Sequence, residues 1–218
     1  TPDHFKIVSL DSFFVKQHIK IMRTSDFFTT LRLILAPIFF LVFCLPDWIG
    51  MGSGFSVFVL VPLFIFMEFT DFLDGFFARK KNEVRDFGKV FDPFADVLAN
   101  LTVLFCFVLT GYMPAFLYVI ILYREMGITF VRMIASSKGV AIGARKGGKL
   151  KTVLYIIAAA FSLFIESLTR LSIPFDSVAS AFSMIGLFLY ISAVVASVFS
   201  FIDYLVCFSS VLRSDKPE

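Results

Sequence analysis

Six long apolar stretches dominate the sequence, and they restrict what a chain of 218 residues can fold into. A helix needs about 20 mostly apolar residues to cross a bilayer. Stretches of this kind occupy residues 27–46, 55–78, 94–113, 114–135, 150–169 and 178–208. Turn-forming residues separate them, namely Pro46, the Gly50–Gly54 segment, Gly111 with Pro114, and Pro174. We therefore predict an all-α integral membrane protein with six transmembrane helices.

The composition supports this fold class. Hydrophobic residues make up 58% of the chain, charged residues only 17%, and the mean hydropathy is +0.88. A typical soluble domain has about 45–50% apolar and about 25% charged residues. Such hydrophobicity also excludes intrinsic disorder. The three cysteines form no CxxC pair and the two histidines lie near the N-terminus, so we expect no zinc site, redox motif or histidine-based triad.

The basic residues predict how the chain is oriented in the membrane. Sixteen of the twenty Lys and Arg residues lie in the N-terminal segment, in the connections after the second and fourth stretches, and in the C-terminal tail. The opposite loops contain Arg170 alone. By the positive-inside rule, both termini and these basic connections are expected to be cytoplasmic. We expect the membrane to be of the bacterial inner-membrane type.

The chain is expected to form one membrane domain between two short flanking segments. Residues 24–212 form the six-helix domain, residues 1–23 an N-terminal cytoplasmic or juxtamembrane segment, and residues 213–218 a cytoplasmic tail. Apolar and basic positions alternate within residues 5–22. Two interpretations of this segment stay open: an amphipathic helix lying on the cytoplasmic leaflet, or a disordered or fusion-derived leader.

Four aspartates lie in and beside the second and third apolar stretches, where charge is costly. Asp71 and Asp74 are three residues apart and Asp92 and Asp96 four apart, so each pair shares a helix face. If the two helices run antiparallel, the four carboxylates converge at the cytoplasmic interface and need cations between them. Oxygen ligands in this number suit one or two Mg²⁺ or Mn²⁺ ions. The alternative is that each Asp caps a helix or pairs with a nearby basic residue.

The same segment, DFLDGFFARKKNEVRDFGKVFDPFAD, resembles the signature of the CDP-alcohol phosphatidyltransferases, D-x2-D-G-x2-A-R-x8-G-x3-D-x3-D. All eight fixed positions match: Asp71, Asp74, Gly75, Ala78, Arg79, Gly88, Asp92 and Asp96. The resemblance implies a homodimeric membrane enzyme that passes a phosphate-linked group from a CDP-activated lipid or alcohol to a hydroxyl, releasing CMP. It also implies that the four Asp bind two Mg²⁺ or Mn²⁺ ions, that Asp96 is the general base, and that Gly75, Ala78 and Arg79 line the nucleotide-diphosphate pocket. The CDP-lipid site would then comprise Thr29, Arg32, Asp71, Gly75, Ala78, Arg79 and Gly88.

Further segments resemble the phosphatidylglycerophosphate synthase branch of this family. Residues 24–37 match its opening at Thr29 and Arg32, although Asp26 stands where Asn is usual. Residues 124–152 match its RE-x6-R and G-K-x-K-T segments, and Val97 replaces a Lys that often follows the last Asp. This resemblance implies glycerol 3-phosphate as the acceptor and CDP-diacylglycerol as the donor. Its cationic residues are Arg124, Arg132, Lys149 and Lys151, which we expect to bind the acceptor phosphate.

Physical arguments support part of this pocket and leave alternatives open. Arg124 and Arg132 lie about 80° apart around a helix, so both can serve one anion. Arg124 could instead pair with Glu125 or Glu68, and Lys149 and Lys151 could simply follow the positive-inside bias. Glu166 and Asp203 receive no catalytic role.

Other functions also remain open. The acceptor could be inositol phosphate, serine, choline or a phosphatidyl lipid. A divalent-cation channel or transporter is a more remote alternative, because the carboxylates lie near one membrane face and no inverted repeat is evident. We expect membrane lipid as a partner and no nucleic acid.

Overall fold

The structure is a computed structural model of the whole chain that describes residues 24–50, 52–81, 88–137 and 146–214. Side chains within these ranges are described except at residues 24–28, 71–81, 88–92, 136–137, 146–149, 207–208 and 210–214. The predicted N-terminal segment 1–23 and the last four residues of the predicted cytoplasmic tail lie outside the described part.

Six α-helices form the described part of the chain, as the apolar stretches predict. They are α2 (Thr24–Ile49), α3 (Ser53–Lys81), α4 (Gly88–Leu109), α5 (Ala115–Ser137), α6 (Lys146–Arg170) and α7 (Ala179–Ser214). A short 3-10 helix, η1 (Asp176–Val178), precedes α7. The all-α prediction is confirmed for these residues.

Four described segments are long and apolar enough to cross a membrane: Thr29–Ile49, Ser53–Thr70, Leu150–Arg170 and Asp176–Val206. They support an integral membrane protein. The apolar part of α4, Pro93–Leu109, is shorter. Helix α5 carries Arg124, Glu125 and Arg132 within its length, which lowers its apolarity. Helix length and apolarity therefore support four candidate spans among the described residues, and the predicted total of six stays a prediction.

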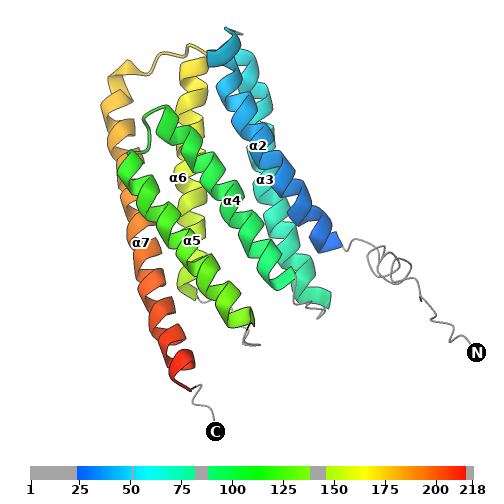
Figure 1. Cartoon of the computed structure of the whole chain (residues 1–218). Coiled ribbons are helices and arrows are strands. Elements are labelled where there is room, and N and C mark those ends of the chain that lie inside the picture. The colour runs from blue at the N-terminus through cyan, green and yellow to red at the C-terminus, as the bar shows by residue number, and fades with distance from the viewer. Residues whose placement is uncertain (1–23, 51, 82–87, 138–145, 215–218) are drawn as a thin grey trace, which may run out of the picture.

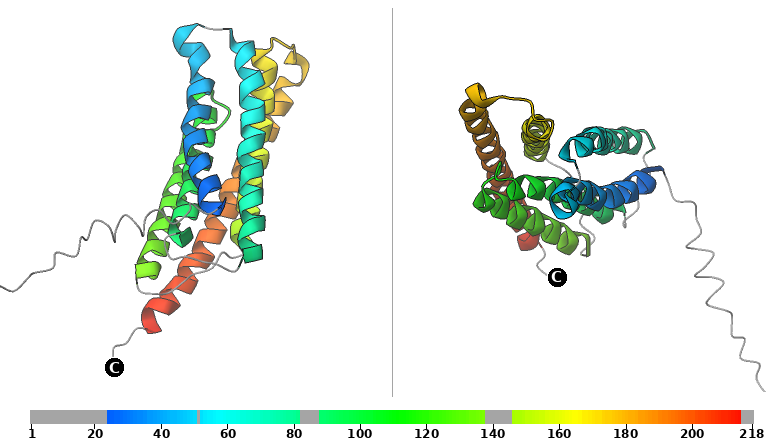
Figure 2. Two further views of the ribbon diagram at one scale, coloured as in Figure 1. Left: turned by 90° about the vertical axis from the view of Figure 1, so that its right-hand side faces the viewer. Right: turned by 90° about the horizontal axis from the view of Figure 1, so that it is seen from above.

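The helices pack as an up-and-down bundle (Figure 1). Helix α2 packs against α3 and α4, α5 packs against α4 and α7, and α6 packs against α7, α3 and α4. Seen from above, α6 lies between α3 and α7 (Figure 2, right). One end of the bundle collects the start of α2, α4 and α6 and the finish of α3, α5 and α7. We call it the basic end, because the sequence segments attached there carry most of the Lys and Arg; the other is the turn end.

Two glycines terminate helices at the turn end. Pro46 was expected to mark a turn, but α2 continues through it to Ile49. The turn comes instead at Gly50, whose φ of 63° is accessible to glycine and whose N–H bonds to the Pro46 carbonyl at 3.0 Å. Gly111, with φ of 78°, makes the turn between α4 and α5 in the same way. A proline in the last turn of a helix removes one hydrogen bond without preventing the rest.

Arg170 is not a loop residue, contrary to the expectation from the sequence. It is the last residue of α6 and is buried. Its Nε donates to Glu166 at 2.6 Å, its Nη1 to the Ser56 hydroxyl at 2.7 Å, and its Nη2 to the Phe43 carbonyl at 2.9 Å. The guanidinium also lies over the Phe43 ring. This buried cation is retained near the turn end because all of its nitrogens find acceptors, and it ties α6 to α2 and α3.

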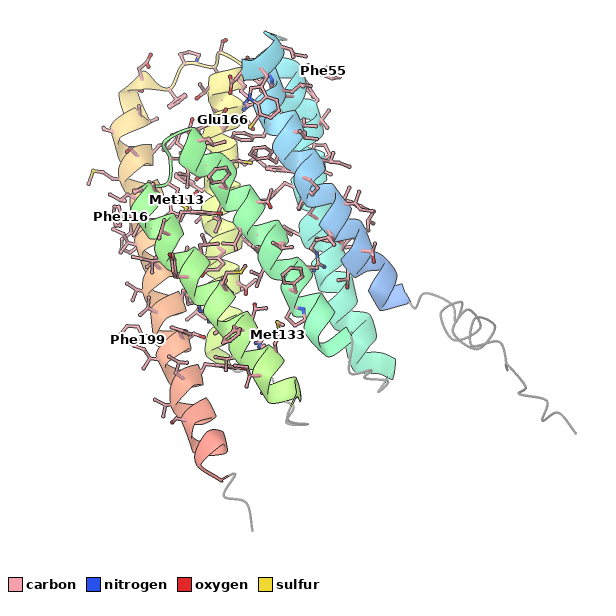
Figure 3. All side chains as sticks on the ribbon, viewed as in Figure 1. Phe55, Met113, Phe116, Met133, Glu166 and Phe199 are labelled. Carbon is pink, nitrogen blue, oxygen red and sulfur yellow. The ribbon has the colours of Figure 1, made fainter. Side chains whose placement is uncertain are left out.

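Aromatic side chains divide between the core and the outer surface. Phe39, Phe43 and Phe107 are fully buried, and the rings of Phe43 and Phe107 meet edge to face with centroids 5.9 Å apart. Phe55, Phe116 and Phe199 instead project from the bundle, as Figure 3 shows. Exposed aromatic surface of this kind fits a protein surrounded by lipid.

Candidate active site

A pocket opens among α2, α3, α4 and α6, within one to four turns of the basic end. Its volume, counted together with the open space at its mouth, is about 310 Å³. Its lining combines polar and apolar residues, namely Arg32, Met67, Glu68, Asp96, Ala99, Asn100, Val103 and Thr152. Two predicted site residues, Arg32 and Asp96, therefore line one pocket although they are 64 positions apart in the sequence.

Arg32 and Asp96 form an ion pair, with a guanidinium Nη1 donating to the carboxylate Oδ1. The Arg32 side chain is buried, whereas the Asp96 side chain is 39% exposed. Arg32 thus fixes one side of the carboxylate and leaves the other accessible from the pocket. Thr29, one turn earlier on α2, is buried.

The other signature residues lie on helix ends next to this pocket. Asp71, Asp74, Gly75, Ala78 and Arg79 belong to the last three turns of α3, and Gly88 and Asp92 to the first two turns of α4. Their side chains lie outside the described part of the chain, so the convergence of four carboxylates stays a prediction. Among the described residues, no group of three or more His, Cys, Asp or Glu side chains could hold a metal ion.

The chemistry of the described pocket fits the predicted ions. Asp96 presents a partly exposed carboxylate, and Glu68 and Asn100 line the same pocket. Carboxylate and amide oxygens are the donors that Mg²⁺ and Mn²⁺ prefer.

A second polar cluster joins α5, α6 and α7. The Glu125 carboxylate accepts from Arg124 Nη1 at 2.9 Å and from the Lys151 ammonium. The Tyr155 hydroxyl lies 3.1 Å from Glu125 Oε1 and 2.6 Å from Ser197 Oγ. The remaining Arg124 nitrogens are also engaged, since Nε donates to the Ser197 carbonyl at 3.1 Å and Nη2 to Ser200 Oγ at 3.0 Å. The pairing of Arg124 with Glu125 that the sequence left open is present.

Arg132 lies two turns further along α5, toward the basic end. Its guanidinium carbon is 5.7 Å from the centre of the Tyr204 ring on α7. The buried Arg132 Nε and the Tyr204 hydroxyl have no hydrogen-bond partner within the described part of the chain. Arg132 and Arg124 both lie close enough to Lys151 for their charges to interact with it. Lys149, the fourth predicted cation, is in the first turn of α6, and its side chain is not described.

Several residues of these two clusters were not predicted as site residues from the sequence. Glu68 precedes Asp71 by three positions and so shares its helix face, a signal that could have been used. Tyr155, Ser197 and Tyr204 carry no comparable signal, because a single polar residue in an apolar helix resembles an ordinary membrane-facing or core position.

Comparison with known proteins connects this site to a family. The family model for CDP-alcohol phosphatidyltransferase matches residues 22–198. A Treponema pallidum (strain Nichols) protein named CDP-diacylglycerol--glycerol-3-phosphate 3-phosphatidyltransferase is 42% identical over 199 residues, which cover 88% of this chain and 92% of the relative. Proteins of the same name from Bacillus subtilis (strain 168) and Mycoplasma genitalium are 32% identical over 175 residues and 29% identical over 193 residues. Those two matches cover 78% and 84% of this chain and 88% and 82% of the relatives. The chain belongs to the CDP-alcohol phosphatidyltransferase family.

Proposed function

We propose that this protein transfers the phosphatidyl group of CDP-diacylglycerol to glycerol 3-phosphate, giving phosphatidylglycerol phosphate and CMP. The family membership and the names of the relatives support the reaction. The observation that carries it is the position of Asp96, the last signature aspartate, in a pocket that also contains Thr152 of the basic G-K-x-K-T segment. A signature residue and a residue of the basic segment that are far apart in the sequence thus line one pocket.

In the proposed mechanism, Asp96 accepts the proton of the acceptor hydroxyl. The hydroxyl oxygen then forms a bond to the phosphorus of the phosphatidyl group, and the bond from that phosphorus to the oxygen of CMP breaks, so CMP leaves. Arg32 holds the Asp96 carboxylate in one orientation, which keeps its exposed oxygen directed to the pocket. Asp71, Asp74, Asp92 and Asp96 would hold the Mg²⁺ or Mn²⁺ ions, whose charge offsets that of the diphosphate.

The basic residues of α5 and α6 would bind the phosphate of the acceptor. Arg132, Lys149 and Lys151 are proposed to contact it. Arg124 would contribute charge without a direct contact, because each of its nitrogens already has a protein partner. Glu125 cancels one charge of the cluster, so Arg124, Lys151 and Arg132 together still carry a net charge of about +2 for a dianionic phosphate.

The proposal extends to the setting of the site. We propose that the basic end and both termini face the cytoplasm, as the distribution of Lys and Arg indicates. The homodimer that the family resemblance implies stays a prediction.

An acceptor panel tests the reaction. Purified protein in detergent is incubated with radiolabelled CDP-diacylglycerol and, separately, with glycerol 3-phosphate, inositol phosphate, serine or choline. We expect CMP release and a new labelled lipid with glycerol 3-phosphate, and chromatography should identify it as phosphatidylglycerol phosphate. Turnover restricted to serine or choline would reject the phosphorylated acceptor. An absence of CMP release with every acceptor would favour the channel or transporter alternative.

Metal dependence is tested in the same assay. Removal of divalent ions with a chelator should abolish CMP release. Four carboxylates that lie close together repel one another, and the proposed cations between them are needed to offset this charge. Addition of Mg²⁺ or Mn²⁺ in excess of the chelator should restore it. Full activity in the chelator would reject the proposed metal role of the aspartates.

A further inference from the structure

We infer that Tyr204 is part of the site that binds the acceptor phosphate, with its hydroxyl donating a hydrogen bond to the same phosphate that Arg132 binds. The inference rests on the proposed function for the identity of the acceptor. It concerns a residue of α7 that lies outside the family signature and outside the basic segments of α5 and α6.

The first observation is that two buried polar groups lie together without partners. Tyr204 is only 4% exposed, and its hydroxyl has no hydrogen-bond partner among the described residues. The Nε of Arg132, whose guanidinium stacks over the same ring, likewise has none. A buried polar group without a hydrogen bond is destabilising, so an unsatisfied pair in a folded protein calls for an explanation.

The second observation is that comparable buried tyrosines are satisfied. The Tyr155 hydroxyl bonds to Ser197, and the Tyr190 hydroxyl lies 2.7 Å from Ser162 Oγ. Tyr190 is on the same helix as Tyr204 and is fully buried. The packing of α5, α6 and α7 therefore supplies partners for tyrosine hydroxyls elsewhere, and the lack of one at Tyr204 is local.

The chemistry of the two groups selects the ligand. The Nε–H of arginine can only donate a hydrogen bond, and a tyrosine hydroxyl can donate one. Arg132 lies over the Tyr204 ring, with its guanidinium carbon 5.7 Å from the ring centre. Donors from two neighbouring side chains beside a permanent positive charge fit an anion with several oxygens, which a phosphate monoester provides. Lys151, whose charge interacts with that of Arg132, precedes Thr152 at the wall of the Asp96 pocket. Lys151 and Thr152 of α6 thus connect the proposed phosphate site at Arg132 and Tyr204 to the Asp96 pocket.

Substitution of Tyr204 by phenylalanine tests the inference, with Tyr190→Phe as the matched control. Each change removes one buried hydroxyl from α7. Tyr204→Phe should raise the KM for glycerol 3-phosphate about tenfold and leave the KM for CDP-diacylglycerol within about twofold, because a hydrogen bond to a charged phosphate is lost. The unfolding temperature in detergent should stay the same or rise, since the lost hydroxyl has no partner to leave unsatisfied. Tyr190→Phe should lower the unfolding temperature and leave both KM values unchanged.

A binding measurement separates this inference from the proposed reaction. The unfolding temperature of each protein is measured with glycerol 3-phosphate, inorganic phosphate or glycerol. Glycerol 3-phosphate and phosphate should stabilise the wild type and Tyr190→Phe, and glycerol should not. Tyr204→Phe should lose most of that shift.

Each outcome is decisive for one of the two statements. A phosphate-dependent shift that requires Tyr204, in a protein that makes no phosphatidylglycerol phosphate, supports the site and rejects the proposed reaction. Normal synthesis with an unchanged acceptor KM in Tyr204→Phe supports the reaction and overturns the inference. A wild-type protein that neither anion stabilises also overturns the inference.

Discussion

The ion pair between Arg32 and Asp96 gives the pocket a carboxylate that is both fixed and accessible. A proton acceptor has to be within hydrogen-bond reach of the attacking hydroxyl, and a freely rotating carboxylate satisfies that condition only part of the time. Arg32 comes from α2 and Asp96 from α4, so the orientation of the carboxylate depends on the packing of these two helices. The proposed proton acceptor and the residue that orients it therefore belong to different elements.

Asp96→Asn and Asp92→Asn should each abolish transfer, by roughly 100-fold or more, because a general base is worth about 10²–10⁴ in rate and an amide supplies neither base nor charge. Both variants should elute as folded protein in detergent, since the amide preserves the shape of the side chain. The measurement is CMP release at saturating Mg²⁺ and Mn²⁺. Asp176→Asn, at an exposed residue of η1 at the turn end, serves as the control and should keep full activity. Turnover near that of the wild type in either test variant would remove that residue from the mechanism.

At the residue scale, the sequence predicts members of a candidate site but not the partners of their side chains. The fixed spacing from Asp71 to Asp96 was sufficient to find the signature. The sequence could not reveal that Arg32 pairs with Asp96, because pairing across 64 residues depends on how α2 packs on α4. From the sequence, Arg124 is expected either to bind phosphate or to pair with an acidic side chain. In the structure, all three of its nitrogens have protein partners, in Glu125, Ser197 and Ser200. Tyr204 could be noticed only once its neighbours were known.

At the scale of helices, the Glu166–Arg170 pair holds α6 near the turn end. Figure 3 shows Glu166 close to that end of the bundle. Arg170 donates to Ser56 on α3 and to the Phe43 carbonyl on α2, so a single side chain links three helices. Helix α6 also carries Lys151 and Thr152, which lie toward its other end. The Glu166–Arg170 pair can therefore affect the candidate site only by changing the position of α6 as a whole.

Glu166→Ala should lower the free energy of unfolding by about 3–5 kcal/mol, because it leaves the Arg170 charge buried without its carboxylate. The double change Glu166→Leu with Arg170→Met should recover most of that loss, since replacing a whole buried pair by apolar residues is often close to neutral. Unfolding temperatures in detergent measure both effects. At low temperature, where each variant is folded, the KM for glycerol 3-phosphate should match that of the wild type. A double variant less stable than the single one would show that the bonds to Ser56 and Phe43 matter more than the ion pair.

The helices themselves were largely predictable, and the exceptions have physical reasons. Apolar runs located all six, because a chain this hydrophobic can satisfy its backbone in lipid only as helices. Pro46 was misleading because the last turn of α2 tolerates a proline, and the glycine four residues later ends the helix. Arg170 was assigned to a loop because the acceptors that allow a buried guanidinium come from α2, α3 and α6, which only the fold brings together.

At the scale of the whole molecule, the two ends of the bundle have different chemistry. The basic end carries the helix ends that bear the signature aspartates and the predicted cations, and the pocket lies just inside it. The turn end holds short connections and the buried Arg170 pair. Helix α2 begins at the basic end and α7 finishes there. The candidate site and these two helix ends therefore lie on the same side of the membrane, whichever way the bundle is oriented.

Cysteine labelling tests that orientation. Single cysteines introduced near Lys81 and near Gly147 should react with a membrane-impermeant maleimide only from the cytoplasmic side, and cysteines near Asp47 and Ile173 only from the opposite side. The expectation follows from the positive-inside rule and from the grouping of the ends of α3 and α6 at the basic end (Figure 1).

The native cysteines allow a clean background for this experiment. Cys44 and Cys106 are buried, so they should react slowly, and Cys207 is replaced by serine. If positions 81 and 147 are both labelled from the outside of the cell, the proposed orientation is reversed, but the two segments still lie on one side of the membrane as the site requires. Labelling of these two positions from opposite sides would contradict the bundle itself, because it would separate the signature on α3 from the basic segment of α6. Only labelling of both positions from the cytoplasmic side agrees with the proposed orientation of the basic end.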